Sequence, residues 1–102
     1  MIAREWSGTV RAADAAEYLE LMRRHAVPDY EAVPGNRGAQ VWHRPDGDGI
    51  VRFTTISWWD SLDAVVAFAG DDVERARYYD FDERFLVDRG PRVRHHEVAD
   101  PL

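Results

Sequence analysis

The side chains best suited to acid–base chemistry lie in the last third of the chain. Tyr78 and Tyr79 are adjacent, as are His95 and His96. A histidine pKa suits proton abstraction from a phenol, and a tyrosine hydroxyl can hydrogen-bond a developing oxyanion. These four are the candidate catalytic residues. The alternatives are packed tyrosines and exposed histidines on an edge strand, and a one-residue shift in strand register exchanges His95 for His96 on the inner face.

A second group of residues could form the wall of a binding site for a flat aromatic ligand. The candidates are Trp58, Trp59, Asn36, His43 and Phe68. Trp58 and Trp59 are neighbours in a predicted strand and so point to opposite faces. One indole could fill the core and the other an interface, or one could line a cavity. Asn36 could orient a carbonyl or an anion, although its place in the Pro34-Gly35-Asn36 turn also explains it.

Metal and cofactor sites are not predicted. His95 and Glu97 share a strand face, but a third ligand would have to be His43, on a strand far from theirs, so two ligands do not make a site. The chain has no cysteine and no lysine, which excludes thiol catalysis, Schiff-base chemistry and a P-loop lysine. No glycine-rich nucleotide motif occurs. Any oxidation is therefore expected to proceed without a cofactor.

Composition limits the remaining possibilities. The 102 residues suffice for one domain, taken as 1–102, and the net charge of −6 disfavours nucleic acid and anionic membranes as partners. The longest apolar run, Ala64 to Ala69, is too short to span a bilayer. We therefore expect a cytoplasmic protein.

The elements that must position these residues follow from hydrophobic periodicity. Strands are predicted at 2–11, 39–44, 50–59 and 92–98. One helix is predicted from an Asp14 N-cap to about His25, before Pro28, and a second begins at Asp60 or Ser61. The second helix has a stripe of Leu62, Val65, Val66 and Ala69, ends at Gly70, and precedes a short helix from Asp71 to Arg77.

The resulting order, β-α-β-β-α-β, is that of a ferredoxin-like α+β fold, an antiparallel sheet with helices on one face. The strand at 50–59 has apolar residues on both faces: Val51, Phe53 and Trp59 on one, and Ile50, Ile56 and Trp58 on the other. The helices can cover one face. A second copy of the chain is the simplest cover for the other, which predicts a homodimer.

Four segments carry a resemblance to a known family: Pro34-Gly35-Asn36-Arg37-Gly38, Ser57-Trp58-Trp59-Asp60-Ser61, Ala67-Phe68-Ala69-Gly70 and Val93-Arg94-His95-His96-Glu97-Val98. Together they resemble the antibiotic biosynthesis monooxygenase-like family. The resemblance implies a dimeric α+β barrel with a pocket between sheet and helices in each protomer. Some relatives oxygenate polycyclic phenols without metal or flavin, and others degrade haem.

Haem degradation is disfavoured within this resemblance. The haem-degrading branch has an asparagine in its first strand, a tryptophan in the second helix and an iron-ligating histidine after it. Here Glu5 and Trp6 stand in the first region, Phe68 in the second and Tyr78 in the third. The favoured function is a cofactor-independent monooxygenase acting on a small aromatic or polyketide-like substrate. The alternative is a non-catalytic homodimer that binds a small ligand or serves a structural role.

Overall fold

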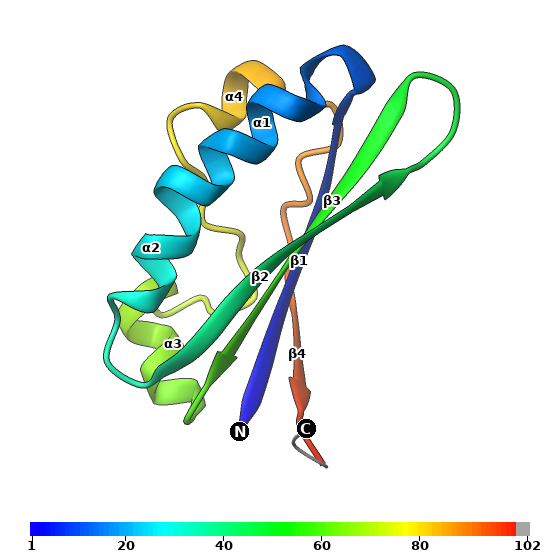
Figure 1. The fold of residues 1–102 in the computed structure, drawn as a ribbon. Coiled ribbons are helices and arrows are strands. Elements are labelled where there is room, and N and C mark those ends of the chain that lie inside the picture. The colour runs from blue at the N-terminus through cyan, green and yellow to red at the C-terminus, as the bar shows by residue number, and fades with distance from the viewer. Residues whose placement is uncertain (100–102) are drawn as a thin grey trace.

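The computed structural model describes residues 1–99 and contains one four-stranded antiparallel sheet. The strands are β1 (Ile2–Arg11), β2 (Asn36–Pro45), β3 (Ile50–Trp59) and β4 (Arg94–Glu97), and their order across the sheet is β2-β3-β1-β4. The helices pack on one face of this sheet (Figure 1). This arrangement confirms the predicted ferredoxin-like α+β fold. The last three residues of the predicted domain and any structure there lie outside the described residues.

The pairing of β1 with β3 sets which side chains face the helices. Ile2 lies opposite Trp59, and Gly8 lies opposite Phe53. Alternation then turns Trp6 and Val10 inward and brings Arg4 inward with them. The buried apolar cluster combines these strand residues with side chains from the helical layer, namely Trp6, Val10, Tyr18, Met22, Ala26, Tyr30, Phe53, Trp59, Val65, Phe68, Ala76, Phe85 and Val93.

The first helical segment runs past the proline that was predicted to end it. It comprises η1 (Ala12–Asp14), α1 (Ala15–Leu21), the π-helical η2 (Met22–Ala26) and α2 (Val27–Glu31). Pro28 lies in the first turn of α2, where its missing N–H matters least. In the wider π turn the Val27 N–H donates to the Met22 carbonyl, five residues earlier. The backbone therefore stays helical through Pro28. The predicted end near His25 is therefore wrong.

The predicted Asp14 cap is also absent. Asp14 makes no side-chain hydrogen bond to the helix N-terminus, and its carboxylate instead accepts from Nε of Arg11 at 3.1 Å. The preceding turn of 3₁₀ helix already supplies the backbone partners that a cap would otherwise provide.

The helix α3 (Leu62–Ala69) begins as predicted, at Ser61, whose Oγ accepts from the Ala64 N–H at 3.3 Å. Gly70 follows it with φ of 85°, as expected for a glycine that ends a helix. The predicted apolar stripe is wrong in part: Val65 and Phe68 are buried, whereas Leu62 is 47% exposed. The helix is rotated so that the large ring, rather than Leu62, faces the core.

Removing the cap provides a test of this helix start. Ser61→Ala is expected to lower the free energy of unfolding by about 1 kcal/mol, because the Ala64 N–H loses its acceptor. Ser61→Asp, which keeps an acceptor at the same position, is the control and should lose much less. Chemical denaturation monitored by circular dichroism measures both; equal losses in the two variants would contradict the capping role.

The segment between α3 and α4 (Asp82–Phe85) forms no helix over 71–77, so that prediction is wrong. Its backbone pairs instead with the run that precedes β4. The Ala76 N–H donates to the Pro91 carbonyl, and the Val93 N–H donates to the Glu74 carbonyl, at 2.9 and 2.8 Å. These long-range bonds compete successfully with a short helix that could form few internal bonds. We call residues 70–81 the covering segment. The last strand correspondingly starts at Arg94 rather than at residue 92.

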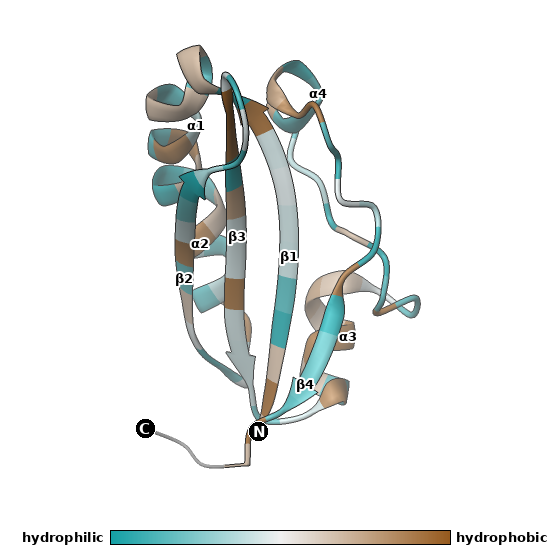
Figure 2. Ribbon diagram, turned by 90° about the vertical axis from the view of Figure 1, so that its right-hand side faces the viewer, coloured by the Kyte–Doolittle hydropathy of each residue, from teal (hydrophilic) through white to brown (hydrophobic). Residues whose placement is uncertain are grey.

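The opposite face of the sheet is not covered by any helix of the described residues. Figure 2 looks onto this face, with the helices behind or beside the strands. Alternation places Trp42, Ile56 and Trp58 on it, and Trp42 is 51% exposed. The prediction that β3 carries apolar residues on both faces is therefore confirmed. We call this surface the open face. No helix in the described part of the chain is long and apolar enough to cross a membrane.

Candidate functional site

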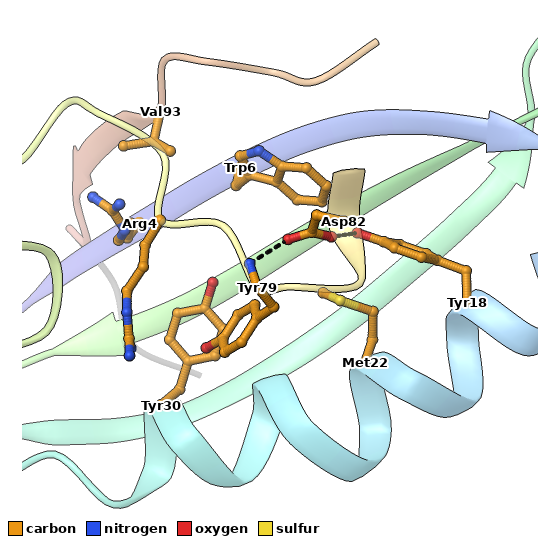
Figure 3. Close-up of a pocket in the computed structure, with 9 residues that line it drawn as sticks. Arg4, Trp6, Tyr18, Met22, Tyr30, Tyr79, Asp82 and Val93 are labelled. Carbon is orange, nitrogen blue, oxygen red and sulfur yellow. Dashed lines mark hydrogen bonds between the residues drawn. The ribbon is translucent and has the colours of Figure 1, made fainter. Parts of the chain in front are cut away.

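A small, partly enclosed cavity lies between the sheet and the helical layer (Figure 3). Its volume is about 10 Å³, enough for about one water molecule. The walls come from β1, from the first helical segment, from the covering segment, from α4 and from the run that precedes β4. They are formed by Arg4, Trp6, Tyr18, Met22, Tyr30, Arg77, Tyr79, Asp82 and Val93. Aromatic rings and polar groups thus surround one point in the interior.

Asp82 places a buried carboxylate in this wall. Its side chain joins two tyrosines, as Figure 3 shows: Oδ1 accepts from the Tyr18 hydroxyl and Oδ2 from the Tyr79 backbone N–H, both at 2.7 Å. Asp82 is only 3% exposed, and burial raises the pKa of its carboxyl. Burial, followed by the neighbouring Asp82 charge, raises the pKa of Tyr18 as well. A carboxylate in such a setting is a candidate general base.

Tyr79 separates the cavity from the surface. Its hydroxyl donates to Oδ2 of Asp29 at 2.8 Å, and the Arg77 guanidinium binds the same oxygen. Tyr79 also lines an outer groove of about 380 Å³, formed with Leu21, His25, Asp80 and Phe81. Burial raises the pKa of Tyr79, so its hydroxyl remains a proton donor at neutral pH. Because one ring forms a wall of both spaces, its displacement would join them.

Two of the predicted aromatic wall residues lie beside this cavity. Trp59 is fully buried, and its Nε1 donates to Ser57 Oγ at 2.9 Å. Phe68 stacks on Tyr30 with ring centroids 4.5 Å apart and lies 5.5 Å from Trp59. These contacts make both rings part of the core that supports the cavity rather than part of its immediate lining.

His95 faces the helical side of the sheet, paired across from Arg4. Its Nε2 lies 3.1 Å from the NH1 atom of Arg4. A guanidinium can only donate, so Nε2 accepts and the proton of the neutral ring lies on Nδ1. Burial lowers the pKa of His95, and the adjacent Arg4 charge lowers it further. His95 is thus a neutral group whose free lone pair is already occupied.

The other predicted site residues lie elsewhere. Trp58 and His96 face the open face, where His96 Nε2 lies 3.0 Å from Glu5 Oε1. His43 is an exposed residue of β2 that stacks on Phe53 at 5.7 Å. Tyr78 donates to the Arg89 carbonyl at 2.9 Å. The structure therefore does not gather the predicted set around one ligand position.

Asn36 has a structural role at the start of β2. Its Oδ1 accepts from the Gly38 N–H at 2.9 Å, at the point where the pairing of β2 with β3 shifts register. This is the turn-stabilising role that its position in the Pro34-Gly35-Asn36 run allowed.

Sequence reasoning missed the most suggestive polar residues of the cavity. In the sequence, Arg4 is distinguished only as a charged residue that alternates with apolar residues along its strand. Asp82 is one of many acidic residues, and nothing around it in the sequence indicates that it is buried. Within residues 1–99, no three His, Cys, Asp or Glu side chains are grouped to hold a metal ion. The described residues thus offer acid–base and anion-binding groups in an aromatic enclosure.

Comparisons with known proteins identify the fold. No family model matches the sequence, and neither does any curated protein. The haem-degrading protein MhuD from Mycobacterium tuberculosis, solved with two haems bound, matches with a TM-score of 0.63 at 20% identity, over 100% of this chain and 99% of that one. A candidate antibiotic biosynthesis monooxygenase from Deinococcus radiodurans matches with a TM-score of 0.70 at 16% identity, over 100% and 96%.

A further candidate antibiotic biosynthesis monooxygenase, from Nitrosomonas europaea, matches with a TM-score of 0.68 at 13% identity, over 98% of this chain and 100% of that one. The resemblance seen in the sequence is thereby confirmed at the level of the fold. At these low sequence identities, similarity of fold does not show that this chain shares the activity of those proteins. The chain is a ferredoxin-like α+β protomer, with the fold of antibiotic biosynthesis monooxygenase-like proteins and of a haem-degrading protein.

Proposed function

We propose that the protein binds a small aromatic or polyketide-like phenol between its sheet and helices and oxygenates it without a cofactor. The observation that carries this proposal is the cavity wall, in which the rings of Trp6, Tyr30 and Tyr79 surround the buried carboxylate of Asp82. Aromatic rings bind a flat substrate, and a buried carboxylate can take its proton. The structures of similar fold, which include candidate monooxygenases, support the same reading.

The reaction can be written for an anthrone, which has an acidic methylene group. A base removes one methylene proton, and the resulting carbanion transfers an electron to O₂. The radical pair recombines to a substrate hydroperoxide anion, which is protonated and loses water to leave a carbonyl. Overall, CH₂ and O₂ become C=O and H₂O, and the substrate supplies all four electrons. The protein therefore has to provide only a base, a proton donor and a dry enclosure.

We assign the base to Asp82 and the proton-donating hydroxyls to Tyr18 and Tyr79. His95 was the predicted base, but its Nε2 already accepts from Arg4. His96 belongs to the open face and Tyr78 points to the Arg89 carbonyl, so the proposed mechanism does not use them. Trp59 and Phe68 support the enclosure from behind Tyr30.

Binding requires the enclosure to open. A ligand pocket for a small molecule usually has about 300 Å³ or more, whereas the cavity has about 10 Å³. Moving Tyr79 away from Asp29 would join the cavity to the outer groove of about 380 Å³. The covering segment, which carries Tyr79, is therefore the proposed mobile part.

Oxygen consumption tests the proposal. Purified, chelator-treated protein incubated with 1,8-dihydroxyanthrone should consume O₂ and form the quinone in equal amounts, well above the spontaneous rate. The heat-denatured protein is the control. If neither this anthrone nor others of a small panel are consumed faster with protein than without, the oxygenase proposal is wrong for this substrate class.

A second function, binding without chemistry, is favoured by one specific observation. The cavity is almost filled by the side chains of its own wall and holds about one water. A protein of this kind would bind an aromatic ligand after the covering segment moves, and would release it unchanged. Saturable binding of the quinone with no acceleration of anthrone oxidation would select this function.

We also propose that a second copy of the chain covers the open face. Trp42 is 51% exposed there and Trp58 is half-buried on the same face, beside Ile56, which is already buried at 8% exposure. An exposed apolar face of this kind marks a protein contact more often than a free surface. The occupant we favour is a second copy, because all the known helices of the chain are already used on the other face.

Light scattering tests this arrangement. The parent is expected to have a mass near twice the chain mass of 11.7 kDa at micromolar concentration. Trp42→Glu should shift the mass toward that of one chain, because a carboxylate would be buried against the partner. Leu62→Glu, at an exposed residue of α3 in the helical layer, is the control. A monomeric parent would contradict the homodimer.

A further inference from the structure

The buried guanidinium of Arg4 is the feature from which we draw a further inference. Arg4 lies near the start of β1, forms part of the cavity wall and is only 3% exposed. It donates to the Val73 carbonyl, to the Arg75 carbonyl at 3.1 Å and to His95 Nε2 at 3.1 Å. A guanidinium has more N–H donors than these three acceptors use. Arg4, a residue of the cavity wall, therefore retains donor capacity for a further acceptor.

No carboxylate of residues 1–99 lies within ion-pair distance of Arg4. Its three partners are two backbone carbonyls and a neutral imidazole, so none of them carries a compensating negative charge. Arg77, by comparison, pairs with Asp29, and Arg52 pairs with Asp46. A buried cation without a counter-ion is destabilising by several kcal/mol on general grounds. Such a cost is expected where the charge has a function.

The surroundings of Arg4 show what could neutralise it. The ring of Phe68 lies 5.9 Å from its guanidinium, and Tyr30 and Tyr79 share the cavity wall with it. Asp82, the acid of the same wall, accepts from Tyr18 and Tyr79 and forms no ion pair with Arg4. A negatively charged group of a molecule that enters the cavity could neutralise Arg4, and it would lie among aromatic rings.

We propose that Arg4 is the recognition group for a negatively charged oxygen of the ligand, so that the protein selects flat aromatic compounds bearing a phenolate, an enolate or a carboxylate. This inference rests on the proposed binding function and narrows its substrate class to anions. His95 acts as a positioning residue, since together with the Val73 and Arg75 carbonyls it fixes the orientation of the Arg4 guanidinium. In the oxygenation proposed above, the same charge would stabilise the carbanion after proton removal.

Two ligands that differ in charge but hardly in shape can test whether Arg4 recognises an anion. The compounds 2-naphthoate and 2-naphthamide have the same ring system and nearly the same size, and only the first is an anion. Isothermal titration at pH 7 is expected to show that the parent binds 2-naphthoate at least about tenfold more tightly, as for a hydrogen bond to a charged group. Arg4→Lys should keep part of this preference, and Arg4→Met should lose it.

Arg52→Met is the control, because Arg52 already has Asp46 as its partner and does not line the cavity. It should retain the preference for the anion. Equal affinity of the parent for both probes overturns the assignment of Arg4 and leaves the binding cavity intact. Failure of both probes to bind the parent overturns the proposed binding function itself. Since the comparison of probes is made first on the parent, it holds even if Arg4→Met fails to fold.

Discussion

Replacing Asp82 with asparagine is expected to lower the rate of protein-dependent anthrone oxidation by about 100-fold or more, because the substrate proton then has no base to receive it. Asparagine has nearly the same shape and can still accept from the Tyr79 N–H, so the wall should remain in place. Glu83→Gln is the control. Glu83 is an exposed acid next to Asp82 in α4 and lines neither the cavity nor the outer groove, so its removal should leave the rate unchanged.

The pKa of Asp82 predicts how this rate depends on pH. Burial raises the pKa of the carboxyl above its ordinary value of 3.8. The base works only when ionised, so the rate should fall on acidification at a higher pH than an exposed aspartate would give. A rate that is insensitive to Asp82→Asn, with oxidation otherwise intact, would remove Asp82 from the mechanism.

The raised pKa of Asp82 also predicts how Asp82→Asn affects stability, which allows loss of activity to be distinguished from loss of fold. A carboxyl whose pKa is raised by folding stabilises the native state at low pH, and that contribution disappears as the pH rises through the folded-state pKa. At neutral pH the ionised Asp82 therefore does not increase the free energy of unfolding. Asp82→Asn is expected to unfold no more readily than the parent at pH 7, which denaturation at that pH can check.

The second large effect concerns stability. Phe68→Ala is expected to lower the free energy of unfolding by about 3–5 kcal/mol, because it removes a buried ring and leaves a cavity. Phe68 is 7% exposed and contacts both Tyr30 and Trp59. A loss of this size is a large part of the about 5–15 kcal/mol that stabilises a typical small domain.

Leu62→Ala is the control in the same helix. Leu62 was predicted to face the core but is 47% exposed, so its truncation should change stability by no more than about 0.5 kcal/mol. Urea denaturation of the two variants measures the contrast. If Leu62→Ala cost as much as Phe68→Ala, the orientation of α3 described above would be wrong.

The strands could be predicted closely because alternation is a local signal. Ile2–Arg11 and Ile50–Trp59 were predicted with the bounds they have, and the side chains of each face followed from the period of two. Helix limits were less predictable where tertiary contacts or backbone adjustments override local preference. Pro28 is accommodated by a π turn, and the run at 71–77 bonds to residues far along the chain instead of to itself.

The candidate site was predicted only in part, because its members come from segments that are far apart in the sequence. Tyr79, Trp59 and Phe68 were identified as aromatic residues at element ends, and they do lie at or beside the cavity. Arg4 and Asp82 could not be singled out, since a charge in a strand or at a helix start is usually exposed. Their importance lies in burial and in their partners, which the sequence does not display. Trp58, His43 and His96 belong to other surfaces.

The most direct test of the central claim, that the ligand binds between the sheet and the helices, uses the indole N–H signals of the tryptophans. Trp6 and Trp59 are buried on the helical side, where Trp6 Nε1 donates to the Gly90 carbonyl at 2.9 Å. Trp42 and Trp58 lie on the open face. Each indole therefore reports on one side of the sheet.

In a ¹H–¹⁵N NMR titration with 1,8-dihydroxyanthraquinone, the product that cannot be consumed, the Trp6 indole signal should shift most. The Trp59 signal should shift less, and the Trp42 and Trp58 signals should stay in place. Assignment by single Trp→Phe variants identifies the peaks. Shifts confined to Trp42 and Trp58 would place the ligand on the open face and contradict the account.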